Sequence, residues 1–190
     1  MSGADRQRRV DYEFSCGVIP FRRIPDRPME FLLLHSVLVR NPDAAWEFPK
    51  GSMDEGETET ETALRELQEE TGIVRVELLP NFRDHVHYKY RREGREIEKT
   101  VTFFTGEVKD WSVIPDKAPT REHGFHPRKG IWHVWVTEEE AHRYLFHPGM
   151  RSLLERPSLF IYEHDRIARA QADDAQIIGE APHLREDPQG

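Results

Sequence analysis

The sequence predicts an α/β fold in which a mixed β-sheet lies between helical layers. Three observations support this prediction: apolar, β-prone runs stand on both sides of one clear helix, more strands follow it, and the pattern closes with further helices. The length of 190 residues fits one domain with short extensions. We expect a flexible N-terminal arm over residues 1–10, the domain over 11–165 and a polar C-terminal tail over 166–190.

Two buried strands open the predicted domain. Residues 16–21 (CGVIPF) and 31–35 (FLLLH) are continuous apolar runs, and a turn with two prolines joins them. A loop over residues 41–45 then leads to a short strand at 46–48, which ends in the sequence Pro-Lys-Gly.

The central helix has the clearest signals in the chain. Thr58 and Glu61 have the spacing of a capping box, which predicts the first turn. Leu64 and Leu67 belong to an apolar stripe that should point into the core, and Gly72 suits the left-handed residue that ends a helix.

A hairpin is predicted after this helix. Residues 74–82 are β-prone, and residues 85–90 and 97–108 alternate well on either side of a turn at 92–94. Residues 110–130 contain three prolines and no periodicity, which predicts a long loop of the kind that is often functional.

The chain should close with one strand and two helices. Residues 131–136 read as a strand, and Thr137 with Glu140 forms a second possible capping box for a helix to about Leu145. A last helix should start at Pro148, and Pro157 should interrupt or kink it.

Composition excludes several classes of partner. Lys and Arg number 27 against 35 Asp and Glu, so the net charge is −8, and we expect neither general nucleic-acid binding nor attachment to an anionic membrane. No segment approaches the roughly 20 apolar residues of a membrane span, and the N-terminus lacks an apolar signal core. The single Cys16 cannot form an internal disulfide. We therefore expect a cytoplasmic protein.

Three glutamates crowd one side of the central helix. Glu66, Glu69 and Glu70 are three and four residues apart, so their carboxylates share a face and repel one another. A divalent cation among them would relieve that repulsion, and hard oxygen ligands suit Mg²⁺ or Mn²⁺. The alternative is a solvated, salt-bridged helix, because Arg65 stands four residues from both Glu61 and Glu69.

The wider pattern resembles the Nudix hydrolase signature, G-x5-E-x7-R-E-U-x-E-E-x-G-U, where U is a bulky aliphatic residue. Every fixed position is present, at Gly51, Glu57, Arg65, Glu66, Leu67, Glu69, Glu70, Gly72 and Ile73. The resemblance implies a Nudix α/β/α sandwich and hydrolysis of a nucleoside diphosphate linked to another group.

The same resemblance implies roles for the signature residues. Glu66, Glu69 and Glu70 would bind the metal together with the Gly51 carbonyl, Glu57 would belong to the same catalytic site, and Arg65 would orient the carboxylates. Bound metal ions neutralise polyphosphate charge and lower the pKa of an attacking water. Which glutamate accepts the proton from that water stays open.

Flanking residues resemble the diadenosine tetraphosphate hydrolases within this family. The lead-in Trp-Glu-Phe-Pro-Lys-Gly at 46–51 carries the resemblance, with further matches over about residues 14–163. It implies phosphate contacts for Lys50 and Lys99, base stacking for Tyr88 or Tyr90, and a metal-site or general-base role for Glu122 in the long loop. The alternatives are ordinary surface lysines, sheet tyrosines and a surface glutamate.

The substrate that this resemblance implies is diadenosine tetraphosphate, cut asymmetrically into ATP and AMP. Other small nucleotides or polyanions stay open, including diphosphoinositol polyphosphates, RNA 5′ ends and nucleoside triphosphates, as does a sensor that binds a nucleotide without turnover. The histidines His85, His87, His123, His126 and His133 fit no closed zinc site, and we expect surface roles for them. The oligomeric state is left open.

Overall fold

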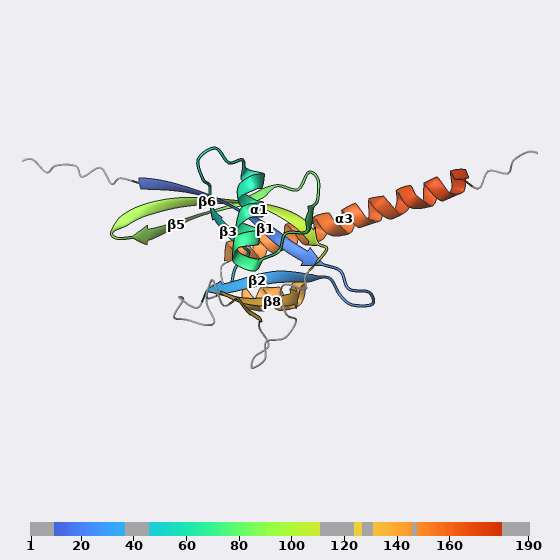
Figure 1. Cartoon of the computed structure of the whole chain (residues 1–190), viewed down its shortest axis with the longest axis horizontal. Helices are drawn as coiled ribbons and strands as arrows, with labels where there is room; N and C mark the ends of the chain where they lie inside the picture. Colours follow the sequence, from blue (N-terminus) through green and yellow to red (C-terminus); the bar gives the residue numbers. More distant parts are fainter. Residues whose placement is uncertain (1–9, 37–45, 111–123, 127–130, 146–147, 180–190) are drawn as a thin grey trace, which may run out of the picture. The chain divides into compact units, whose positions relative to one another are not determined.

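The computed structural model describes residues 10–36, 46–110, 124–126, 131–145 and 148–179 (Figure 1). Its elements are β1 Val10–Arg22, β2 Glu30–Ser36, β3 Lys50–Ser52, α1 Glu59–Thr71, β4 Val76–Leu78, β5 Asp84–Arg92, β6 Arg95–Val108, β7 Gly124–His126, β8 Ile131–Thr137, α2 Glu138–Tyr144 and α3 Pro148–Gly179. The chain divides into two compact units, Met1–Pro157 and Ser158–Gly190. The candidate site lies in the first unit.

The strands of the first unit form one mixed sheet. Their order is β4-β6-β1-β2-β8-β7, with β3 paired to β1 and β5 paired to β6. The pairing of β1 with β6 is parallel, and the other pairings are antiparallel. The predicted α/β fold with a mixed sheet is therefore confirmed.

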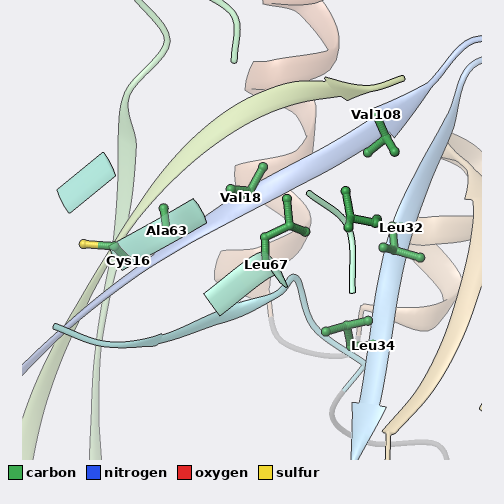
Figure 2. Packing of buried hydrophobic residues seen from close by; sticks show 8 residues of the cluster. Cys16, Val18, Leu32, Leu34, Ala63, Leu67 and Val108 are labelled. Carbon is green, nitrogen blue, oxygen red and sulfur yellow. The ribbon is translucent and has the colours of Figure 1, made fainter. Parts of the chain in front are cut away.

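Strand β1 separates two environments, because successive side chains of a strand point to opposite faces. On one face, Cys16 and Val18 pack with Ala63 and Leu67 of α1 in the buried core (Figure 2). Glu13 and Ser15 have the opposite parity and belong to the other face of the sheet. The two faces carry the two halves of the candidate site.

The caps of α1 form as the sequence predicts. The Glu61 amide donates to Thr58 Oγ1 at 3.2 Å, and the Thr58 amide donates to Glu61 Oε2 at 2.8 Å. Gly72 ends the helix with φ 82°, and its amide donates to the Gln68 carbonyl at 2.7 Å. Leu67 is fully buried as expected, whereas Leu64 is only half-buried and lines an open groove rather than the core.

The predicted hairpin is β5–β6. Arg92 pairs with Arg95, and the two residues between them, Glu93 and Gly94, have φ values of 52° and 79°. Positive φ at both central residues matches the right-handed twist of the strands, so the turn continues the ladder without splaying it.

Several local predictions differ from the structure. Strand β1 begins at Val10, inside the predicted arm, and only Val76–Leu78 of the β-prone stretch 74–82 is a strand. Strand β7 lies within the segment expected to be a loop, because its pairing with β8 supplies order that no local pattern encodes.

Helix α3 is longer than predicted. It runs from Pro148 through Pro157 to Gly179, so residues 166–179 of the predicted tail are helical. The predicted interruption at Pro157 is not found, although a proline inside a helix removes one hydrogen bond. In the parts of the chain that the structure describes, no helix combines the length and apolarity needed to cross a membrane.

Candidate active site

The short strand β3 places Gly51 against α1. Cys16 of β1 is the pairing partner of Gly51, and a Cβ atom at Gly51 would lie 2.0 Å from the Glu66 carboxyl carbon. Any side chain at position 51 would therefore displace the Glu66 carboxylate. The glycine of the signature is needed here for close approach, and not for a left-handed backbone.

Glu70 meets the same strand one residue earlier. The Lys50 amide donates to Glu70 Oε2 at 2.9 Å. Burial raises the pKa of the Glu70 carboxyl to about 7, and the Lys50 amide and ammonium oppose that rise. Two carboxylates of α1 thus converge on adjacent residues of β3.

Arg65 contacts several of the acids that lie next to Glu70 and β3. Its Nε and Nη2 donate to the two Glu57 oxygens at 2.7 and 3.0 Å, a bidentate pair. Its Nη1 donates to Glu66 Oε1 at 2.8 Å, and its Nη2 also donates to the Ser52 carbonyl at 2.9 Å. Nη1 lies 3.6 Å from Glu69 Oε1. The strongest contacts thus go to Glu57 and Glu66, and not to the i±4 residues.

Glu57 is held from three sides. Besides Arg65, the Thr62 hydroxyl donates to it at 2.7 Å and the Asp54 amide at 3.1 Å. These donors, Arg65 first and Thr62 second, lower the pKa of the Glu57 carboxyl to about 2. Glu57 is therefore ionised at all physiological pH values and balances the guanidinium charge.

We call Glu57, Glu66, Glu69 and Glu70 the carboxylate side of the site. Their exposure differs: the Glu66 side chain is 14% exposed and the Glu69 side chain 47%. Among the residues that the structure describes, no three Asp, Glu, His or Cys side chains form a ready metal cage. The metal-ligand assignment of Glu66, Glu69, Glu70 and Gly51 thus stays a prediction.

The donor chemistry nevertheless fits a hard divalent cation. Glu66 and Glu70 bring carboxylate oxygens to adjacent residues of one strand, and Glu70 is costly to keep charged without a cation. Arg65 is the cation that now satisfies Glu66, so a bound metal would compete with it for that carboxylate.

Lys50, Lys99, Tyr88 and Tyr90 gather on the opposite face of the sheet, and we call these four residues the cation face. Tyr88 pairs with Lys99 across β5–β6, and Lys99 is in register with Glu13 of β1, whose side chain points away from α1. Because the two tyrosines are two residues apart, they share this face, with ring centroids 6.2 Å apart at 38°.

Each lysine of the cation face has its own carboxylate. Lys50 Nζ lies 2.7 Å from Glu47 Oε2, and Lys99 Nζ lies 3.7 Å from Glu13 Oε2. Burial, with the nearby Lys50 charge, lowers the pKa of Lys99. For Lys50, burial lowers the pKa, but the charge and hydrogen bond of Glu47, with Tyr88 and Glu70, together outweigh it and the pKa rises.

Sequence reasoning missed Glu13 and Glu47. Glu47 stands three residues before Lys50, a spacing that could have suggested the ion pair. No local signal points to Glu13, because it meets the site through the parallel pairing of β1 with β6. Glu122, the predicted distal glutamate, lies outside the described residues.

The histidines need one correction. His85 and His87 are exposed as expected, but His133 is buried, and its Nε2 lies 3.2 Å from the Glu70 carbonyl at the end of α1. It pairs with Leu34 in the centre of β2–β8, which explains its burial. His123 and the side chain of His126 lie outside what the structure describes.

Known proteins resemble this chain in sequence and in fold. A family model described as NUDIX domain matches residues 16–156. An asymmetrical bis(5′-nucleosyl)-tetraphosphatase from Rattus norvegicus is 42% identical over 106 residues, which are 52% of this chain and 67% of that protein. The enzyme of the same name from Sus scrofa is 32% identical over 154 residues, 77% of this chain and 94% of that protein. A solved structure of a C. elegans Ap4A hydrolase shares the fold, with TM-score 0.59 and 24% identity over 79% of this chain and 98% of that one.

Proposed function

Because the chain belongs to the Nudix family, and is thus a hydrolase of a family that generally needs a divalent metal, we propose that it cleaves diadenosine tetraphosphate asymmetrically into ATP and AMP. The observation that carries this proposal is the position of Lys50. Its amide holds Glu70 of the carboxylate side, and its ammonium belongs to the cation face. One residue thus joins a hydrolytic half to a half suited to a long, anionic, base-bearing ligand.

On the carboxylate side, Glu66, Glu69, Glu70 and the Gly51 carbonyl would hold Mg²⁺, or Mn²⁺ in its place. The bound ions supply phosphate charge neutralisation and a water of lowered pKa. Glu57 and Arg65 act through the others: the guanidinium, fixed by Glu57, sets the direction of the Glu66 carboxylate.

On the cation face, Lys50 and Lys99 would bind phosphate oxygens. Their side chains are 12% and 17% exposed, so their charges act in a poorly solvated environment where each is worth more than at the surface.

Tyr88 and Tyr90 would receive a base of the substrate. Stacking of a base on an aromatic ring contributes roughly 1–3 kcal/mol and tolerates different bases. The half-buried rings lie beside the lysines, so a base and its phosphates could be bound together. Glu122 is proposed as a further acid of the site, with a general-base role in proton transfer from water.

A substrate panel tests this proposal. The purified chain is incubated with Mg²⁺ and diadenosine tetraphosphate, a nucleoside triphosphate, a 5′-triphosphorylated RNA or a diphosphoinositol polyphosphate, and products are separated by chromatography. We expect the highest kcat/KM for diadenosine tetraphosphate, with ATP and AMP in equal amounts.

Other products of the panel would contradict it. Two ADP as products would exclude the asymmetric cut. A higher kcat/KM for another member of the panel would make that compound the substrate. Tight nucleotide binding without turnover of any substrate would make the chain a sensor.

A further inference from the structure

Glu13 stands in the site although it precedes the residues that match the family. The match begins at residue 16, and β1 begins at Val10, so Glu13 lies in the part of this strand that precedes the matched residues. Parallel pairing puts Glu13 in register with Lys99 of β6, on the face that carries the tyrosines.

One carboxylate serves three groups there. The Tyr90 hydroxyl donates to Glu13 Oε2 at 2.7 Å, and Lys99 Nζ lies 3.7 Å from the same oxygen. Arg92 Nη2 donates to the other oxygen, Oε1, at 2.5 Å. The Glu13 side chain is 23% exposed, so these contacts are partly shielded from water.

These contacts restrict both groups that the proposed function needs. A tyrosine whose hydroxyl is anchored cannot turn its ring freely, and a lysine beside a fixed carboxylate loses fewer rotamers when it binds a ligand. From this geometry we infer that Glu13 is a positioning residue for substrate binding, which holds Tyr90 for base stacking and Lys99 for phosphate contact.

The inference rests on the proposed function and deepens it. A carboxylate beside a lysine can instead compete with phosphate for the cation. The two roles predict opposite changes. Loss of a positioning residue weakens substrate binding, whereas loss of a competing counterion strengthens it.

The test is the variant Glu13→Gln, with Glu98→Gln as the matched control. Glu98 pairs with Lys89 on the same hairpin but on the opposite face. We expect Glu13→Gln to raise KM for diadenosine tetraphosphate on the order of ten-fold, because the contacts of this side chain lose their negative charge, with kcat within about two-fold. Glu98→Gln should leave both constants unchanged.

A second pair of variants asks whether Glu13 acts through Tyr90. Tyr90→Phe keeps the ring and removes the hydroxyl, so Glu13→Gln should raise KM less in that background than in the original chain. Equal factors in the two backgrounds, a lower KM in Glu13→Gln, or the same rise in Glu98→Gln would each overturn the inference. Absence of turnover in the unaltered chain would instead refute the proposed function.

Discussion

On the carboxylate side one arginine contacts several acids, whereas on the cation face the two lysines contact different acids. Arg65 contacts Glu57, Glu66 and Ser52 with a single planar fork. Lys50 lies beside Glu47, in the segment just before β3, and Lys99 lies beside Glu13 of β1.

The difference follows from where the residues lie in the chain. The shared arginine and its partners fall within residues 52–66, where one loop and one helix fix their spacing. Lys50 also has its acid three residues away, but the pair of Lys99 and Glu13 depends on two strands that are distant in sequence. The contacts of Arg65 can therefore be written in a short motif, whereas the Lys99–Glu13 pair cannot.

The largest effect is expected from a substitution on the carboxylate side of the site. Glu70→Gln removes a charged oxygen donor while keeping an acceptor for the Lys50 amide, so the fold should persist. We expect kcat to fall by at least about 100-fold, since even groups that only support metal ligands cost 10–100-fold. Turnover of diadenosine tetraphosphate with Mg²⁺ measures this.

Glu61→Gln is the matched control, because glutamine also completes a capping box on the same helix. Its kcat should stay near that of the unaltered chain. Full activity in Glu70→Gln would remove Glu70 from the metal-ligand assignment.

The second effect tests the shared arginine. Arg65→Lys keeps the charge but cannot bond Glu57 in bidentate form while also reaching Glu66 and Ser52. We expect a fall in kcat of roughly 10–100-fold, with more Mg²⁺ needed for half-maximal rate. Arg83→Lys is the control, since Arg83 pairs with Glu59 in exposed positions. An unchanged Mg²⁺ requirement in Arg65→Lys would contradict the orienting role.

The third effect concerns the individually paired lysines. Lys50→Met and Lys99→Met should each raise KM by about ten-fold, because a charge-assisted contact to phosphate is lost. Lys89→Met, on the opposite face of the hairpin, should leave KM unchanged. If either replacement lowered kcat without changing KM, that lysine would act in the chemical step instead.

The smallest effect is a pH dependence on the cation face. The Tyr90 hydrogen bond, followed by Arg92, lowers the pKa of Glu13 below 4.5. A depressed folded-state pKa means that the stabilisation is fully present above 4.5 and is lost as the pH falls through the folded value.

The melting temperatures of the unaltered chain and of Glu13→Gln, compared across pH, measure this contribution. The unaltered chain should melt higher at neutral pH, and the two curves should approach each other in acid. Curves that stay parallel from pH 7 into the acid range would show that the Glu13 charge contributes no stability.

Local signals explain what the sequence could predict. The capping box of Thr58 and Glu61, the end of α1 at Gly72 and the β5–β6 hairpin depend on residues a few positions apart, and all three are found. Strand β7 was missed because its order comes from pairing with β8.

The site follows the same division. The signature predicted that Glu57 and Arg65 belong to the site. Arg65 donates to Glu57 and Glu66, however, and not to the residues four positions away that helix geometry suggests. The buried His133 and the contacts of Glu13 depend on strand register, which a single sequence does not reveal.

Strand β3 is only three residues long, yet its alignment is fixed from two directions. The Val18 amide donates to the Pro49 carbonyl at 3.1 Å, and the same carbonyl would lie 2.3 Å from a Cβ atom at Gly17, so little sliding is possible. A one-residue insertion or deletion beside Lys50 would invert the alternation of this strand. The Lys50 ammonium would then point toward α1, and Glu70 would lose the backbone amide that holds it. A shift of one residue in β3 would therefore impair hydrolysis and ligand binding together.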